Sequence, residues 1–98
     1  MKIQAKQQKG DSGRTKYVLS GEATIYSAVD LRQSLADILS SPGDIDLDLG
    51  GIEKIDTAGF QLFHLMGREA GRLGRTVSFM NLSNEAKRLF DLYCEDHQ

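Results

Sequence analysis

Residues 44–59 read DIDLDLGGIEKIDTAG, and this stretch decides the fold. From Asp44 to Leu49 acidic and apolar residues alternate, which predicts a strand that packs one face against a core. The other face carries Asp44, Asp46 and Asp48, and we expect it to be partly solvated or to meet basic side chains. Gly50-Gly51 is expected to break this strand.

The next segment, residues 52–55, leads into the polar turn Ile55-Asp56-Thr57-Ala58-Gly59. The turn opens a long helical pattern that extends from about Gly59 to Leu73. Residues 76–80 then return to a strand pattern. A strand, a helix and a further strand in this order indicate a crossover unit, so at least one pair of strands should be parallel.

Two short strands are predicted before this unit, over residues 2–6 and 16–20. The glycines, aspartate and serine of residues 9–13 predict the turn of a β-hairpin between them, and Gly21 is expected to close the second strand. A helix should follow, with Ser27 as its cap and Asp30 in its first turn. Its apolar stripe comprises Ala28, Leu31, Leu35, Ile38 and Leu39, and Ser41-Pro42-Gly43 ends it.

A last helix begins after Ser83, which is placed to cap it, and has Glu85 in its first turn. One face of this helix carries Ala86, Leu89, Phe90 and Tyr93. The predicted order is therefore ββαβαβα. It implies an α/β fold with a mixed four-stranded sheet and three helices packed mainly on one side. With 98 residues, the chain 1–98 is expected to form a single domain.

Composition excludes several classes of protein. A hydrophobic share of 40% and a charged share of 27% are typical of a folded chain, and a net charge of -2 argues against a nucleic-acid binder. The single cysteine, Cys94, fits a reducing compartment. No apolar run approaches the ~20 residues that span a bilayer, and no signal peptide opens the chain. We expect a cytoplasmic protein with no membrane insertion.

Catalytic and metal-binding patterns are not found. The histidines are His64, in the middle of a helix, and His97, and the Cys94–His97 segment is expected to be a frayed tail. The three aspartates of residues 44–48 resemble the opening of a calcium loop, but Leu49 and Ile55 stand where that loop needs glycine and glutamate. Phosphate-binding loops are absent. The sequence therefore predicts no enzyme, no cofactor, no metal and no small-molecule substrate.

Thr57 allows two interpretations. A hydroxyl at the start of a helix can cap it, and spacing alone favours this interpretation. Alternatively, Thr57 accepts a phosphoryl group. The free amides of the helix start would favour the phosphate, whereas the neighbouring Asp56 would oppose it.

The long helix has three predicted faces. Its core side comprises Leu62, Met66, Ala70 and Leu73, and a basic stripe opposite comprises Gln61, His64, Arg68, Arg72 and Arg75. Between them Gly67, Gly71 and Gly74 form a smooth flank beside Phe60. Since glycine disfavours a helix by about 1 kcal/mol, something should approach this flank closely, either a neighbouring helix or a partner.

The sequence resembles the STAS domain family (sulfate transporter and anti-sigma-factor antagonist) over almost its whole length. Three segments carry the resemblance in the right order: residues 19–31, residues 47–59 and residues 83–91. The first contains Leu19-Ser20-Gly21-Glu22, the second Leu47-Asp48-Leu49 and the turn of residues 55–59. The chain is thus similar to a short single-domain member.

This resemblance implies a regulatory module that docks onto other proteins. In partner-switching members a serine in a D-S-S-G turn is phosphorylated by an anti-sigma kinase, and the phosphate breaks the complex. Here the usual acceptor position is Ala58, so Thr57 is the remaining candidate phosphoacceptor. The expected docking residues are Asp56, Thr57, Ala58, Gly59, Phe60, Gln61, His64, Gly67, Arg68 and Gly71.

Three functions follow as hypotheses. The first is a signalling switch, controlled at Thr57, whose partner is a histidine-kinase-like anti-sigma ATPase or a chemotaxis protein. The second is an accessory subunit of an ABC-type transporter ATPase of the lipid-asymmetry kind, as in small STAS subunits with a D-T-A-G turn. The third, a nucleotide or anion binder, ranks last because the chain has no phosphate loop.

Overall fold

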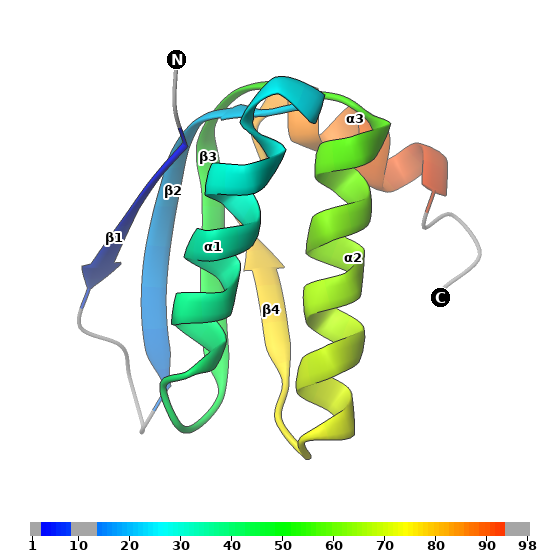
Figure 1. The fold of residues 1–98 in the computed structure, drawn as a ribbon. Coiled ribbons are helices and arrows are strands. Elements are labelled where there is room, and N and C mark those ends of the chain that lie inside the picture. Colours follow the sequence, from blue (N-terminus) through cyan, green and yellow to red (C-terminus); the bar gives the residue numbers. More distant parts are fainter. Residues whose placement is uncertain (1–2, 9–13, 94–98) are drawn as a thin grey trace.

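A four-stranded sheet in the order β1-β2-β3-β4 is the framework of the computed structural model, which describes residues 3–8 and 14–93 (Figure 1). The strands are β1 (Gln4–Gln8), β2 (Thr15–Ala23), β3 (Ile45–Ile55) and β4 (Val77–Met80). β1 runs antiparallel to β2, whereas the β2–β3 and β3–β4 pairs are parallel. The predicted mixed sheet and its parallel crossover are confirmed.

Helices α1 (Ala28–Leu39) and α2 (Thr57–Arg72) lie side by side over one face of the sheet (Figure 1). Helix α3 (Asn84–Tyr93) follows β4 and packs against β3 and α2, near the end of the sheet where α2 begins. β4 pairs only with residues 45–48 of β3. The later part of β3 therefore extends beyond β4, and α3 packs against β3 in this region.

The core lies between the sheet and helices α1 and α2, because the two central strands alternate as their sequences predict. On β3, Ile45, Leu47 and Leu49 are fully buried. The α1 stripe contributes Leu31, Leu35 and Ile38. From α2 the buried side chains are Phe60, Phe63, Met66 and Ala70. Phe63 was not among the expected core residues, and the expected Leu73 is exposed.

The opposite face of the sheet is polar and carries the predicted contacts between acids and basic side chains. Arg14 Nη2 lies 2.7 Å from Asp46 Oδ1, and Lys16 Nζ lies 3.9 Å from Asp48 Oδ2. Asp44 Oδ1 accepts the backbone N–H of Thr76 at 2.9 Å. This hydrogen bond, assisted by the Arg14 charge, lowers the pKa of Asp44.

Several predicted boundaries were wrong. β2 does not close at Gly21 but runs on to Ala23, and Gly21 adopts a φ of 108° beside a register shift. β3 continues through Gly50-Gly51, so these glycines mark an irregularity in the pairing with β2 and not a break. The antiparallel pairing of β1 with β2 is confirmed, whereas the predicted turn at residues 9–13 lies outside the described residues.

Helix starts were predicted with mixed success. α1 is preceded by the short 3-10 helix η1 (Ile25–Ser27), which Thr24 caps. Ser27 does not cap α1, because its hydroxyl donates to the Glu22 carbonyl instead. The predicted cap of α3 is confirmed, since Ser83 Oγ accepts the N–H of Ala86 at 3.1 Å.

Candidate functional site

Asp56 caps α2 and fixes the turn to the preceding part of the chain. Its Oδ1 accepts the N–H of Gly59 at 3.0 Å, and its Oδ2 accepts the N–H of Ile25 at 2.9 Å. The interpretation of Thr57 as the capping residue was therefore wrong. The two carboxylate oxygens of Asp56 accept one N–H each, from the first turn of α2 and from η1.

Gly59 allows the first turn of α2 to approach β2 closely. A Cβ atom at this position would lie 1.8 Å from the carbonyl oxygen of Ala23, which is backbone and cannot rotate away. The N–H of Asp56 donates to the same Ala23 oxygen at 3.2 Å. The close contact that requires a glycine is therefore at Gly59, at the start of the helix.

Thr57 is the first residue of α2, and its side chain is exposed. Its Oγ1 lies within hydrogen-bond distance, 3.1 Å, of Tyr93 Oη near the end of α3. The Tyr93 ring in turn stacks on Phe60, with ring centroids 5.1 Å apart and an interplanar angle of 30°. The candidate phosphoacceptor is thus accessible and also linked to the last helix.

Four large apolar side chains gather around this turn on its α1 side, and we call them the apolar patch: Ile25, Tyr26, Val29 and Leu65. They are 61%, 96%, 82% and 54% exposed, respectively. A shallow groove of about 280 Å³ between α1 and α2 is lined by Val29, Ala58 and Leu65 among others. The Asp56 bond to the Ile25 N–H places η1 beside the turn.

The apolar patch was missed at the level of the sequence, although a signal was present. Val29 lies outside the stripe predicted for the first helix, and Leu65 lies outside the predicted core side of the long helix. Apolar residues that remain after each helix has been given its buried stripe are candidates for an exposed face.

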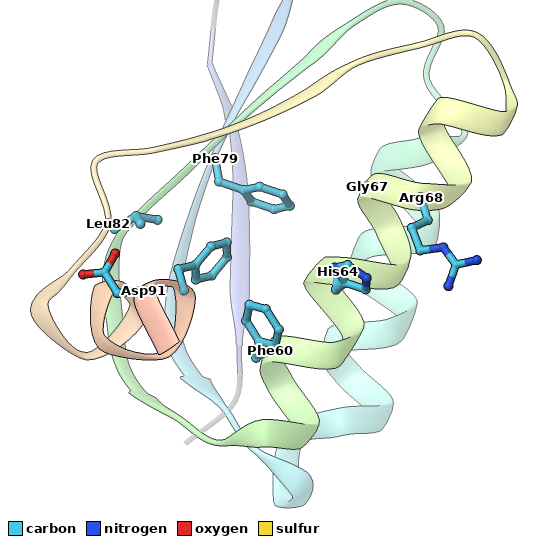
Figure 2. Close-up of a pocket in the computed structure, with 8 residues that line it drawn as sticks. Phe60, His64, Gly67, Arg68, Phe79, Leu82 and Asp91 are labelled. Atoms are coloured by element: carbon cyan, nitrogen blue, oxygen red, sulfur yellow. The ribbon is translucent and has the colours of Figure 1, made fainter. Parts of the chain in front are cut away.

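The ten expected docking residues do not share one surface. Ala58 and Gln61 line the groove on the α1 side, whereas His64, Gly67 and Arg68 line a hollow on the α3 side (Figure 2). Gly59 and Phe60 are buried, so a protein partner could contact them only if the structure rearranged. Asp56 is half-buried, and Thr57 and Gly71 are exposed.

The predicted glycine flank and basic stripe were also only partly right. Among the described residues, Cβ atoms placed on Gly71 or Gly74 would meet nothing within 4 Å beyond their own helix backbone and chain neighbours, so no helix of this part of the chain packs there. Gly74 has a φ of 75°, which glycine tolerates after the end of a helix. Arg75 leaves the stripe, because its guanidinium donates to the carbonyls of Leu39, Ser41 and Gly43.

The described residues contain no group of three or more His, Cys, Asp or Glu side chains arranged to hold a metal ion. Within the same part of the chain, no helix is long and apolar enough to cross a membrane.

Comparisons with known proteins bear on this geometry. The family model described as "Mlab, STAS domain" matches residues 7–97. An anti-sigma-B factor antagonist from Bacillus subtilis (strain 168) is 28% identical over 74 residues, which cover 76% of this chain and 68% of that protein.

Solved structures show the same fold. The crystal structure of an anti-sigma factor antagonist from Mycobacterium paratuberculosis has a TM-score of 0.76 at 22% identity, over 97% of this chain and 80% of the other. The anti-sigma factor antagonist SpoIIAA in its unphosphorylated form has a TM-score of 0.66 at 15% identity, over 91% and 79%. The family model, the relative and the fold agree: the chain belongs to the STAS domain family and is a regulatory STAS domain.

Proposed function

We propose that the chain is a non-catalytic module that docks onto a protein partner through the apolar patch and the adjoining Thr57 turn. The observation that carries this proposal is the exposure of Tyr26 and Val29, at 96% and 82%, in a segment that the Asp56–Ile25 hydrogen bond joins to the turn of the exposed Thr57. Burial of such side chains stabilises a complex by about 25 cal/mol for each Å² of apolar surface that the partner covers. Tyrosine is also enriched in protein interfaces.

The partner that the relatives favour is a regulatory ATPase of the anti-sigma kinase kind, since the similar proteins are named anti-sigma factor antagonists. We also propose that this one-domain chain works in the cytoplasm. Its single cysteine, Cys94, cannot form a disulfide within the chain, which fits a reducing compartment.

Control at Thr57 belongs to this proposal. A phosphoryl group there would add about -1.5 to -2 charge beside Asp56 and at the edge of the apolar patch. It would also remove the hydroxyl that bonds to Tyr93. The added charge opposes the burial of this surface, so the phosphate should release the partner.

A second candidate is a permanent accessory subunit of a transporter ATPase. Ala58 favours it, because the position that carries the phosphoacceptor serine in switching members cannot be modified here. In that case the same apolar patch would be covered permanently, and Thr57 would contribute only its hydroxyl.

The test is affinity capture from native lysate followed by binding measurements with the purified partner. We expect mass spectrometry to identify an ATPase, and calorimetry with that ATPase to show that Leu65→Glu and Thr57→Glu weaken binding about tenfold or more. Leu92→Glu is the matched control, because Leu92 is similarly exposed, at 58%, but lies on α3. Equal affinities of the Leu65 and Leu92 variants would overturn the docking surface.

Intact-mass analysis of the protein from its native cell, with phosphatases inhibited, separates the two candidates. A phosphate on Thr57 supports the switch. An unmodified chain that stays with a transporter ATPase through purification supports the accessory subunit and contradicts the switch.

A further inference from the structure

An aromatic hollow of about 560 Å³ lies between α2, β4 and α3 (Figure 2). It shares no lining residue with the groove beside the apolar patch. Its walls include the rings of Phe60, Phe79 and Phe90. Its size is within the range of about 300 to 1,000 Å³ that is typical of small-molecule sites. Nothing in the docking proposal uses this space.

The aromatic walls hold one another in place. The centroids of Phe60 and Phe90 are 5.1 Å apart in an edge-to-face arrangement, and those of Phe79 and Phe90 are 5.3 Å apart. Phe60 is buried, whereas Phe79 and Phe90 are only half-buried. Phe79 and Phe90, supported by the buried Phe60, therefore present a preformed apolar surface to whatever enters the hollow.

Gly67 keeps the hollow open on its α2 side. A Cβ atom on Gly67 would find its nearest neighbour, Cε2 of Phe79, only at 3.9 Å. A larger side chain at this position would therefore fit the backbone and project into the space. The glycine is not needed for helix packing, but its missing side chain leaves volume next to the Phe79 ring.

Charge is distributed unevenly around the rim. His64 and Arg68 lie on the α2 side, and Asp91 lies on the opposite side, on α3 (Figure 2). Arg72, one turn further along α2, pairs with Glu69 at 3.1 Å. Arg68 forms no ion pair within residues 3–8 and 14–93. Its guanidinium can therefore donate hydrogen bonds to an anion at the edge of the aromatic walls.

We propose that this hollow binds a small amphipathic anion. An aromatic or aliphatic body would pack against Phe79 and Phe90, and a carboxylate or similar group would pair with Arg68, away from Asp91. The walls supply apolar contact and one rim supplies the positive charge, which is the combination that such a ligand requires. The site is separate from the apolar patch and does not depend on the docking proposal.

A matched pair of probes tests both halves of the proposal. 2-Naphthoate carries the apolar body and the anion, and 2-naphthalenemethanol carries the same body without charge. In an NMR titration of the full chain, we expect amide shifts at Gly67, Phe79 and Phe90 and none at Val29. The naphthoate should bind about three- to fivefold more tightly than the alcohol, the size of one solvated ion pair, and Arg68→Gln should remove this difference.

Gly67→Leu should strongly weaken the binding of both probes, because its side chain would occupy the space beside the Phe79 ring. Gly71→Leu is the matched control, since it adds the same side chain to the same helix where nothing lies within 4 Å. Arg68→Gln changes only an exposed side chain, so it remains informative if Gly67→Leu does not fold. The proposal is overturned if neither probe binds at millimolar concentration, if Gly67→Leu and Gly71→Leu bind equally, or if the shifts gather at the apolar patch.

Discussion

The hydroxyl groups of Thr57 and Tyr93 lie 3.1 Å apart, and they join the first turn of α2 to the end of α3. The Tyr93 ring also stacks on Phe60, the fourth residue of α2. The environment of Thr57 therefore depends on the position of α3, and the Thr57 and Tyr93 hydroxyls should be energetically coupled.

A double-mutant cycle measures this coupling. We expect Thr57→Val and Tyr93→Phe to show a coupling free energy of about 0.5 kcal/mol, at the low end for a hydrogen bond because both groups are exposed. Tyr93→Phe keeps the ring on Phe60, so the cycle isolates the hydroxyl pair. The measurement is urea unfolding of the four proteins, and additive effects would show that the bond contributes nothing.

The cap of α2 gives a second prediction. Asp56→Ala should lower the free energy of unfolding by about 1 to 2 kcal/mol, because the N–H groups of Gly59 and Ile25 lose their shared acceptor. Asp56→Asn, which keeps one acceptor, should lose less. Thr57→Ala should change stability by no more than about 0.5 kcal/mol, and a larger loss for Thr57 than for Asp56 would restore the threonine as the cap.

Two glycines in one helix should respond in opposite directions to the same change. Gly59→Ala should destabilise the fold by about 3 kcal/mol or more, because its methyl group would overlap the Ala23 carbonyl. Gly71→Ala should stabilise it by about 0.5 to 1 kcal/mol, since the position is exposed, helical and uncrowded. Thermal unfolding of both variants is sufficient, and a tolerated Gly59→Ala would contradict the close approach of α2 to β2.

The polar face of the sheet makes stability depend on pH. The Thr76 N–H, with help from Arg14, lowers the pKa of Asp44 below its usual 3.8 in the folded state. A lowered folded pKa stabilises the protein above the unfolded pKa, and this contribution is lost as pH falls through the folded value.

We therefore expect Asp44→Asn to be less stable than wild type at neutral pH, and the difference to shrink below the usual pKa of an aspartate and to disappear below the lowered pKa of Asp44 in the folded state. Urea unfolding midpoints of both proteins across pH 2 to 7 provide the measurement. A difference that persists unchanged into acid would show that the charge of Asp44 is not responsible.

The order of helices and strands was predictable from the sequence because apolar residues repeat with a period of about two residues in strands and about 3.6 in helices. The alternation from Asp44 to Leu49 gave a half-buried strand, and Ser83 marked the start of α3 correctly. The strand boundaries that were predicted from glycines were wrong. Gly21 and Gly50-Gly51 resemble strand ends, but a sheet accommodates them as irregularities when neighbouring strands supply the hydrogen bonds.

The site was harder to predict because it depends on contacts distant in sequence. The cap of α2 is local, because Asp56 accepts the N–H of Gly59 three residues on, and the sequence could have indicated it, since aspartate is a preferred N-cap residue. Its second bond, to the Ile25 N–H 31 positions away, could not be predicted in this way. Tyr93 meets Thr57 only through the packing of α3. The helical wheel of α2 placed His64 and Arg68 correctly at the surface but could not show that β4 and α3 form a separate hollow beside them.

The most direct test of the docking proposal is photo-crosslinking in the native cell, with benzoylphenylalanine placed singly at Tyr26, at Leu65 or at Leu92. We predict that the first two positions, in the apolar patch, crosslink to the same ATPase and that Leu92 does not. Crosslinking of that ATPase at Leu92, with none at Tyr26 or Leu65, would contradict the account.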